Sequence, residues 1–552
     1  MPSLRRGHCF TPRHTRLRAR QDAAHESIIY SYKHGFSGFA AKLTESQVEE
    51  LRMQTTRSWD FLGQNYYKPT GLLKKAKGKD IIVGVIDSGH GLNHGALMTV
   101  ATALCRDGGK AYARRVTRSR PPDSCNRKII GARLYVNDTT AEHLEGEHLS
   151  PRDFNGHGTH CASTIAGVPV QNASHGGFAA GVARGGAPRA RVAVYKACWG
   201  RPASCSTAGL IAAIDDAIHD GVDVLSLSVG NVATHTPGTL HAVARGITEV
   251  FAAGNEGPVP QTVANASPWL ITVAASTIDR SVISLGNGQK LVVPPFEQHY
   301  LFNLNPSTKH PSGGVNISDI QEFVYEFGCD SKTLESTNLT GSIIVCLAPW
   351  QVASSLPASE MFVNAVEIAA NASAKVIIFA QYTTSKVVDV LQHCKSRGIL
   401  CVAVDLEIGN IILVLEDIST AVAMIGDGVP SPRIAAFSSR GPSMSFPAIR
   451  TEPDIAAPGV GILAAKGNSY VFMSGTSMAC GACPHVSAIV ALLKSVDPNW
   501  SLAMIKSAIV TTASVIDRSG MPIQAEGVPR KTADPFDFGA GHIPLTGLLI
   551  PA

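Results

Sequence analysis

The chain of 552 residues lacks the patterns that mark membrane-spanning or disordered proteins. No uninterrupted apolar stretch approaches the roughly 18 residues that a transmembrane helix needs, so we predict no membrane span. Charged residues make up only 16% of the chain and hydrophobic residues 45%, a balance that excludes disorder and favours a large packed core. Internal repeats are also absent. At roughly 100–200 residues per domain, this length predicts two to four domains.

The net charge of +5 does not indicate a basic protein. Residues 1–20 contain six Arg and no acidic residue, which leaves a net charge of −1 on the remaining chain. A nucleic-acid partner is therefore not predicted. The start of the chain also lacks the apolar core of a signal peptide and only weakly resembles a mitochondrial transit segment. We expect residues 1–24 to be a disordered basic tail.

Metal-binding patterns are missing as well. Cys480 and Cys483 have C-x-x-C spacing without the second half of a zinc site, and no dense acidic loop of the EF-hand type occurs. We therefore predict no metal and no cofactor.

The twelve Cys and seven N-x-S/T sequons favour the secretory route. Close Cys pairs predict short disulfide-closed loops, the alternative being small buried side chains: Cys198 with Cys205, Cys329 with Cys346, and Cys394 with Cys401. The sequons begin at Asn137, Asn172, Asn265, Asn316, Asn338, Asn371 and Asn499.

Strand and helix patterns alternate between residues 80 and 285. The predicted strands are 81–86, 191–197, 222–227, 249–253 and 270–275, with a helix over 210–218 and another before residue 249. This order predicts an α/β fold whose parallel sheet has helices on both faces and ligand sites at the carboxyl ends of its strands. Asp87 and Asn255 both follow such an end. The core pattern resumes at 434–439 and 455–465, with two helices over 484–496 and 501–513.

Three short motifs predict one reaction. Asp87 lies in D-S-G, His157 in N-G-H-G-T-H and Ser477 in S-G-T-S-M-A. A serine hydroxyl is a poor nucleophile unless a base accepts its proton, and that base needs a carboxylate to orient it. The amide of Asn255, in A-A-G-N-E-G-P, is a candidate donor to the oxyanion of a tetrahedral intermediate, with the backbone N–H of Ser477 as the second donor.

Each motif alone has a simpler explanation. D-S-G after a strand is commonly a turn, and G-T-S is a common helix cap. His157 and His160, together with Cys161, would suit a metal-dependent hydrolase, which chelators would inhibit. The joint occurrence of all the motifs in the order Asp, His, Ser favours the serine mechanism.

The chain resembles the plant-type subtilisin-like serine proteases, or subtilases. The similarity is carried by S-P-R-D-F-N-G-H-G-T-H-C-A-S-T at 150–164, D-G-V-D-V-L-S-L-S at 220–228, F-S-S-R-G-P at 437–442 and P-D-I-A-A-P-G at 453–459. Residues 26–51 resemble the inhibitory propeptide of the family, and T-T-R-S-W-D-F-L-G at 55–63 resembles the start of the mature enzyme.

This resemblance implies a subtilisin-like parallel sheet flanked by helices, with an inserted, mostly-β protease-associated domain. It implies a propeptide at 25–54, a catalytic domain at 55–300 and 426–552, and the insertion at 301–425. The implied catalytic residues are Asp87, His157 and Ser477, with Asn255 at the oxyanion; Ser226, Leu227 and Ser228 would line the substrate cleft. Polypeptide substrates, the chain's own propeptide as a partner and an extracellular location follow from the same resemblance.

The chain departs from the family pattern in three places. The stretch after Asp87 reads H-G-L-N-H-G-A-L-M-T where the family has W-P-E-S-x-S-F, which we interpret as a frameshift or a misassigned exon. Three extra residues separate Ser477 from Pro484, so that either Gly481 loops out or a helix restarts at Pro484. The propeptide-like segment is short, and from the end of this sequence we expect the fibronectin-III-like domain of the family to be absent. The alternative function is an impaired, protease-like binding protein.

Overall fold

The computed structural model describes a large part of the chain. The described residues are 28–32, 38–41, 57–65, 69, 71–91, 94–97, 126–175, 178–201, 203–229, 238–281, 283–284, 290–291, 323–327, 339–348, 358–374, 376–381, 394, 397, 399–405, 424–425, 431–444, 453–479, 484–527 and 530–544. The predicted basic tail, the proposed frameshift beyond residue 97, and the extra residues at 480–483 lie outside these ranges.

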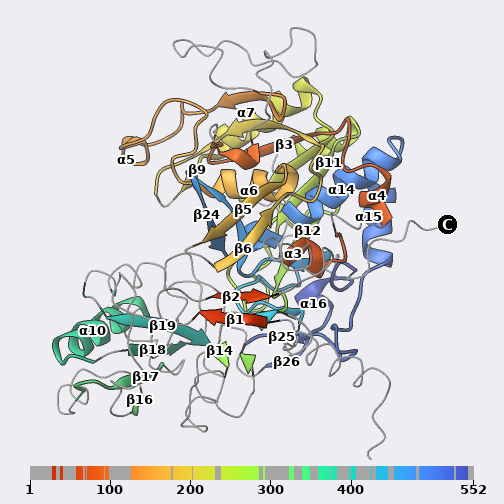
Figure 1. Ribbon diagram of the computed structural model, residues 1–552. Coiled ribbons are helices and arrows are strands. Elements are labelled where there is room, and N and C mark those ends of the chain that lie inside the picture. The colour runs from red at the N-terminus through yellow and green to blue at the C-terminus, as the bar shows by residue number, and fades with distance from the viewer. Residues whose placement is uncertain are drawn as a thin grey trace, which may run out of the picture.

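A ten-stranded sheet forms the centre of the molecule (Figure 1). Its parallel strands, in spatial order, are β4 (Ile129–Leu134), β7 (Arg191–Lys196), β3 (Ile82–Asp87), β10 (Val224–Leu227), β11 (Thr248–Ala252) and β12 (Ile271–Ser276), and β12 also pairs with β22 (Ile455–Pro458). The short strands β21 (Arg433–Ile434), β25 (Gln524–Ala525) and β26 (Lys531–Thr532) extend the far edge. The predicted parallel α/β sheet is confirmed.

Helices cover both faces of this sheet because its strands are apolar on both sides. Val224 packs into the core cluster that contains α6 (His157–Ala166) and α14 (Pro484–Val496), whereas the next residue, Leu225, packs against α7 (Thr207–Asp220) and α8 (Thr239–Ala244). Side chains alternate between the two faces of a strand, so a continuous apolar run fills both cores. Asp87 and Asn255 therefore lie at the same, carboxyl edge of the sheet.

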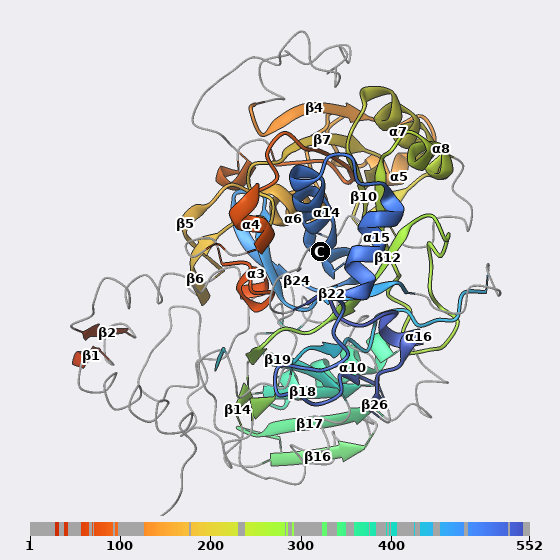
Figure 2. The same ribbon diagram turned by 90° about the vertical axis from the view of Figure 1, so that its right-hand side faces the viewer.

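The predicted insertion contains a smaller sheet of its own (Figure 2). Four parallel strands lie side by side: β16 (Phe323–Phe327), β17 (Ile343–Ala348), β18 (Val376–Gln381) and β19 (Leu400–Asp405). Helix α10 (Ala358–Asn371) connects β17 to β18, as parallel neighbours require, and Val366 and Ala369 pack against Ile377 and Phe379. The pattern of strands alone did not indicate this helix.

Short elements complete the described chain. The helices are α3 (Arg57–Phe61), α4 (Gly71–Lys75), η1 (Gly95–Leu97), α5 (Ala141–Leu144), α13 (Thr476–Ala479), α15 (Leu502–Thr511) and α16 (Pro535–Phe538). The antiparallel pairs are β1 (Ile28–Tyr32) with β2 (Gly38–Ala41), β5 (Val170–His175) with β6 (Phe178–Ala183), β8 (Cys198–Trp199) with β9 (Ser204–Cys205), β13 (Arg280–Ser281) with β20 (Met424–Ile425), β14 (Ile283–Ser284) with β15 (Lys290–Leu291), and β23 (Ile462–Lys466) with β24 (Ser469–Met473).

One stretch, Thr476–Val496, is long and apolar enough to cross a membrane by length and composition. Of its most apolar window, 93% is buried inside the protein, which is typical of a core helix. It therefore gives no support to a membrane span.

The cysteines and sequons are placed as follows. The predicted disulfide between Cys198 and Cys205 is present, and Cys346 and Cys394 are also disulfide-bonded. Asn265 is buried and its amide donates to the backbone oxygens of Val229 and Ala252, so glycosylation would require this part of the fold to open. Four other sequon asparagines are exposed: Asn137, Asn172, Asn371 and Asn499.

Candidate active site

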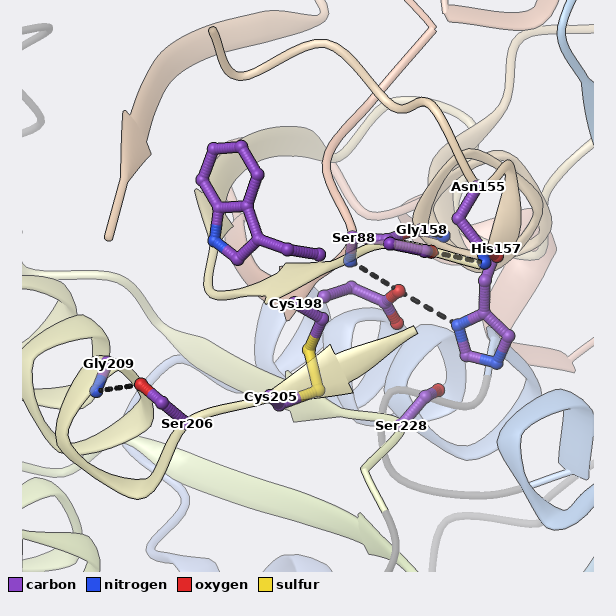
Figure 3. The surroundings of a disulfide bond; sticks show 12 residues. Ser88, Asn155, His157, Gly158, Cys198, Cys205, Ser206, Gly209 and Ser228 are labelled. Carbon is purple, nitrogen blue, oxygen red and sulfur yellow. Dashed lines mark hydrogen bonds and ion pairs between the residues drawn. A yellow bond between two sulfur atoms is a disulfide. The ribbon is translucent and has the colours of Figure 1, made fainter. Parts of the chain in front are cut away.

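The predicted carboxylate and base are in contact. Asp87 ends β3, His157 begins α6, and the His157 Nδ1 lies 2.8 Å from the Asp87 Oδ1. In Figure 3, Ser88 and the His157 ring reach the same carboxylate oxygen, and the Ser88 N–H donates to it at 2.7 Å. Asp87 is buried and its Oδ2 has no described partner. The carboxylate therefore fixes Nδ1 as the protonated nitrogen of the neutral ring and leaves Nε2 free to accept a proton.

Two further residues hold this pair in place. The Ser88 hydroxyl donates to the Asp153 Oδ1 at 2.9 Å and accepts from the Gly158 N–H at 2.9 Å. Asp153 also accepts from the N–H groups of Gly156 and Thr159 and from the Thr159 hydroxyl. Asp153 thus caps the helix that His157 begins, although the N-cap residue itself is Gly156. The sequence analysis missed Asp153; the signal was an Asp a few residues before the first helical residue.

Electrostatics favour the protonated form of His157. Burial alone lowers the pKa of the imidazole, but the Asp87 carboxylate and the Cys161 sulfur together outweigh this effect, so that the pKa of His157 is raised well above its ordinary value. One turn along α6, the Cys161 sulfur lies 3.9 Å from the His157 Nδ1. Burial raises the pKa of this thiol, which keeps it neutral.

The predicted nucleophile shares a neighbour with the base, since the Cys161 sulfur lies near both residues, but its hydroxyl is turned towards the residue that follows β10. The Ser477 hydroxyl donates to the Ser228 backbone oxygen at 3.2 Å, and the Ser228 hydroxyl donates to the Ser477 backbone oxygen at 3.0 Å. The Cys161 sulfur lies 3.5 Å from the Ser228 hydroxyl. Cys161 therefore lies between His157 and the hydrogen-bonded pair of Ser228 and Ser477. Among the described residues, no hydrogen bond joins Ser477 to His157. A rotation of the serine side chain is needed before the base can accept its proton.

Helix α13 carries Ser477, and α14 begins at Pro484. The extra residues lie between these two helices, outside the described ranges, so both arrangements predicted for them stay predictions. Ser477 itself is helical, since the Met478 and Ala479 N–H groups both donate to the Gly475 backbone oxygen.

Asn255 is oriented for the predicted role. Its Oδ1 accepts from the Thr476 N–H at 2.8 Å and from the Thr476 hydroxyl at 2.9 Å. With the amide oxygen held beside the nucleophile, the Nδ2 group is left as a donor, and the side chain is exposed. An oxyanion formed on Ser477 would meet a preorganised N–H donor here.

Two of the three residues predicted to line the cleft present no side chain to it. Ser226 is fully buried and hydrogen-bonded to the Ser487 hydroxyl at 2.9 Å, and Leu227 lies in the core beside Phe251. Both belong to β10 ahead of its carboxyl end, which explains their burial. Only Ser228 lies in the site, as Figure 3 shows beside the His157 ring.

The ligand set of the metal-hydrolase alternative is not assembled. The His160 Nε2 faces the Ile462 backbone oxygen at 2.9 Å, and burial lowers the pKa of His160 to about 3. His160 is therefore a neutral core residue and not a co-ligand of His157. Asp87, His157 and Cys161 do offer ligand atoms within 4.8 Å of one another.

A parallel α/β sheet with Asp, His and Ser side chains gathered at its carboxyl edge is typical of a serine hydrolase. Residues 78–541 match the Subtilase family, and residues 8–56 match Peptidase inhibitor I9, a match that begins well before residue 25. The chain belongs to the subtilase family and is a serine protease.

Individual relatives of the chain belong to the same family. The chain is 40% identical to Subtilisin-like protease SBT3.9 and 39% identical to Subtilisin-like protease SBT3.7, both of Arabidopsis thaliana. Each alignment covers 95% of this chain and 71% of the relative. A psychrophilic subtilisin-like protease, Apa1 of Pseudoalteromonas sp. AS-11, has a crystal structure that is 18% identical with a TM-score of 0.41, covering 89% of this chain and 96% of that one.

Proposed function

We propose that this protease hydrolyses peptide bonds through an acyl-enzyme formed on Ser477, with His157 as the base, Asp87 as its orienting carboxylate and Asn255 at the oxyanion. The 2.8 Å contact between His157 and Asp87 at the carboxyl edge of the sheet carries this proposal. Ser477 would leave the Ser228 oxygen, rotate towards the His157 Nε2, transfer its proton there and attack the substrate carbonyl. The amide Nδ2 of Asn255 and the Ser477 N–H would stabilise the resulting oxyanion.

The division of the chain supports the same activity. We propose a propeptide that ends before Thr55, a catalytic domain at 55–300 and 426–552, and the insertion at 301–425. The first residues after that junction are already part of the core: Trp59 is fully buried beside His485, and Arg57 pairs with Asp279. Cleavage at Thr55 would thus leave the new N-terminus anchored. The Cys198–Cys205 disulfide supports an extracellular place of action, where disulfides persist.

Labelling with a fluorophosphonate tests this mechanism, because only a serine with a working base and oxyanion site reacts. We expect labelling of the wild type and none of Ser477→Ala or His157→Ala. The labelling rate should rise with pH through a pKa above 6.5, since the base form of His157 is needed and its pKa is raised.

Ser474→Ala is the matched control, since the Ser474 hydroxyl accepts only a backbone N–H from Gly461. It should be labelled like the wild type. Folded, processed wild-type protein that is not labelled would contradict the proposal and support the impaired, protease-like alternative. That alternative has one structural observation in its favour, the Ser477 hydroxyl turned towards Ser228.

A further inference from the structure

The disulfide loop at 198–205 packs against the segment that leads into the catalytic histidine. Strands β8 and β9 form a small hairpin closed by the Cys198–Cys205 bond (Figure 3). Cys198 is buried, whereas Cys205 is only half-buried, so a small thiol in solution can reach the bond. Within the hairpin, Gly200 has a φ of 86°, and a Cβ at this position would lie only 3.2 Å from the His143 backbone, so that both backbone conformation and space favour glycine.

Three contacts tie this loop to residues 147–155. The Gly200 N–H donates to the Glu147 Oε1 at 3.0 Å, and the Asn155 amide donates to the Gly200 backbone oxygen at 3.1 Å. Arg201 donates to the Phe154 backbone oxygen and stacks over the Phe154 ring. Gly200 is thus held on both its N–H and its C=O by residues of one segment.

The same segment is anchored to the strand beside Asp87. The Lys196 Nζ lies 2.9 Å from the Glu147 Oε2 and 2.7 Å from the Arg152 backbone oxygen, with both charged side chains buried. Lys196 is the register partner of Asp87 in the sheet. The start of the segment, at Glu147, and its Arg152 backbone are therefore held by the strand that pairs with β3, which carries Asp87. Its last residue, Asn155, is held by the disulfide loop.

Only Gly156 separates Asn155 from His157. Gly156 has a φ of 97°, a conformation that glycine adopts without strain but does not enforce by itself. The Asp153 carboxylate, which accepts from the Gly156 N–H at 2.7 Å, provides one constraint on the entry to α6, and the contact between Asn155 and Gly200 adds a second. Figure 3 shows Asn155 close to His157 at the start of this helix.

We propose that the Cys198–Cys205 loop, acting through Asn155, is a positioning element for His157, and that reduction of the disulfide by small thiols lowers the chemical rate of the protease. In that reaction each cysteine sulfur gains one electron and one proton, and the two external thiols are oxidised to a disulfide. The inference rests on the proposed function, since it concerns the same base.

The rate of fluorophosphonate labelling measures the reactivity of Ser477 directly, because the small probe does not depend on the binding of a peptide substrate. We expect Asn155→Ala, the double variant Cys198→Ser/Cys205→Ser, and reduced wild type each to label about 10- to 100-fold more slowly than oxidised wild type, because displacements near 1 Å have effects of this size. Reduction of the double variant should cause no further loss, which separates this bond from the disulfides of Cys346 and Cys394. The matched control is Ser206→Ala, which removes the cap of α7 on the far side of the disulfide and should label normally.

A second readout does not depend on activity. Cys161 is buried one turn after His157, and its alkylation by iodoacetamide, mapped by mass spectrometry, should accelerate when the start of α6 loosens. Equal labelling rates for oxidised and reduced wild type, or an unchanged Cys161 alkylation rate, would overturn the inference. If wild type is never labelled, the proposed function fails, and the alkylation rates alone decide the positioning role.

Discussion

At the scale of single residues, Glu249 is an acidic side chain buried in the central sheet. It lies on β11, fully buried, and neither carboxyl oxygen has a partner among the described residues. Burial raises the pKa of Glu249 well above its ordinary value, so the folded protein holds this side chain protonated. Phe251, two residues along the same strand, occupies the apolar face to which this carboxyl also points.

We predict that Glu249→Val stabilises the catalytic domain. The folded state keeps a proton that the unfolded chain releases above about pH 4.5, so wild-type stability falls as pH rises, until the folded-state pKa is reached. The valine variant should remove this slope and add about 1–3 kcal/mol at neutral pH, the usual cost of a buried unsatisfied polar group. Urea unfolding midpoints between pH 5 and pH 8 measure both effects.

Glu249→Gln is the control. It removes the titration but keeps a buried polar group, so the pH slope should vanish while most of the cost remains. Identical pH slopes for wild type and Glu249→Val would show that this carboxyl is ionised or solvated in the folded protein.

At the scale of elements, the start of α6 determines whether the catalytic pair is aligned. Asp153 accepts from two backbone N–H groups of this helix start and from the hydroxyls of Thr159 and Ser88. Since Ser88 follows Asp87 directly, one carboxylate orients both the helix of the base and the strand end of its partner.

We predict that Asp153→Ala lowers kcat far more than it changes KM. Loss of the cap should cost about 1–2 kcal/mol of stability, and the misaligned His157 should reduce kcat by roughly a hundredfold. Steady-state kinetics on a protein substrate, with thermal unfolding alongside, measures the two effects. Asp153→Asn keeps one acceptor oxygen and should recover part of kcat; an unchanged kcat in Asp153→Ala would refute the positioning role.

The elements themselves were largely predictable from the sequence, and the contacts between them were not. Helix α14 ends at the predicted residue, and β7 and β3 agree with prediction within one residue, because uninterrupted apolar runs bounded by Gly, Asp or Pro leave few alternatives. The reciprocal bonds between Ser228 and Ser477 depend on loop geometry that no local pattern encodes. Ser226 and Leu227 were placed at the cleft although they lie two residues and one residue before Ser228, inside the buried strand.

At the scale of the whole molecule, four buried histidines are uncharged, and three of them join separate elements. Burial lowers the pKa of His90 and His542 to about 4 and that of His160 and His485 to about 3. His160 connects α6 to β23, His485 connects α14 to α13, and His542 bonds the Ser276 hydroxyl at the end of β12. Their protonation would place charges throughout the core.

We predict loss of stability as the pH falls from about 6.5 towards 4. In this range the unfolded chain binds protons at these four side chains and the folded protein does not, so unfolding takes up protons and becomes easier at lower pH. Each histidine contributes about 1.4 kcal/mol per pH unit. Three buried carboxyl groups have the opposite effect on the pH dependence of stability, because burial raises their pKa values: Asp60, to about 6, Asp454 and Glu249. The four histidines outnumber them, so we expect a net loss of stability.

Urea midpoints measured in steps from pH 7 to pH 4.5 check this balance, and His160→Gln isolates one contribution. Glutamine can still donate to the Ile462 oxygen but cannot be protonated, so the variant should have a slope that is smaller by about 1.4 kcal/mol per pH unit. His219→Gln, on the exposed side of α7, is the matched control and should leave the slope unchanged. If His160→Gln has the wild-type slope, His160 is accessible to protons in the folded protein, and its burial does not contribute to the acid sensitivity.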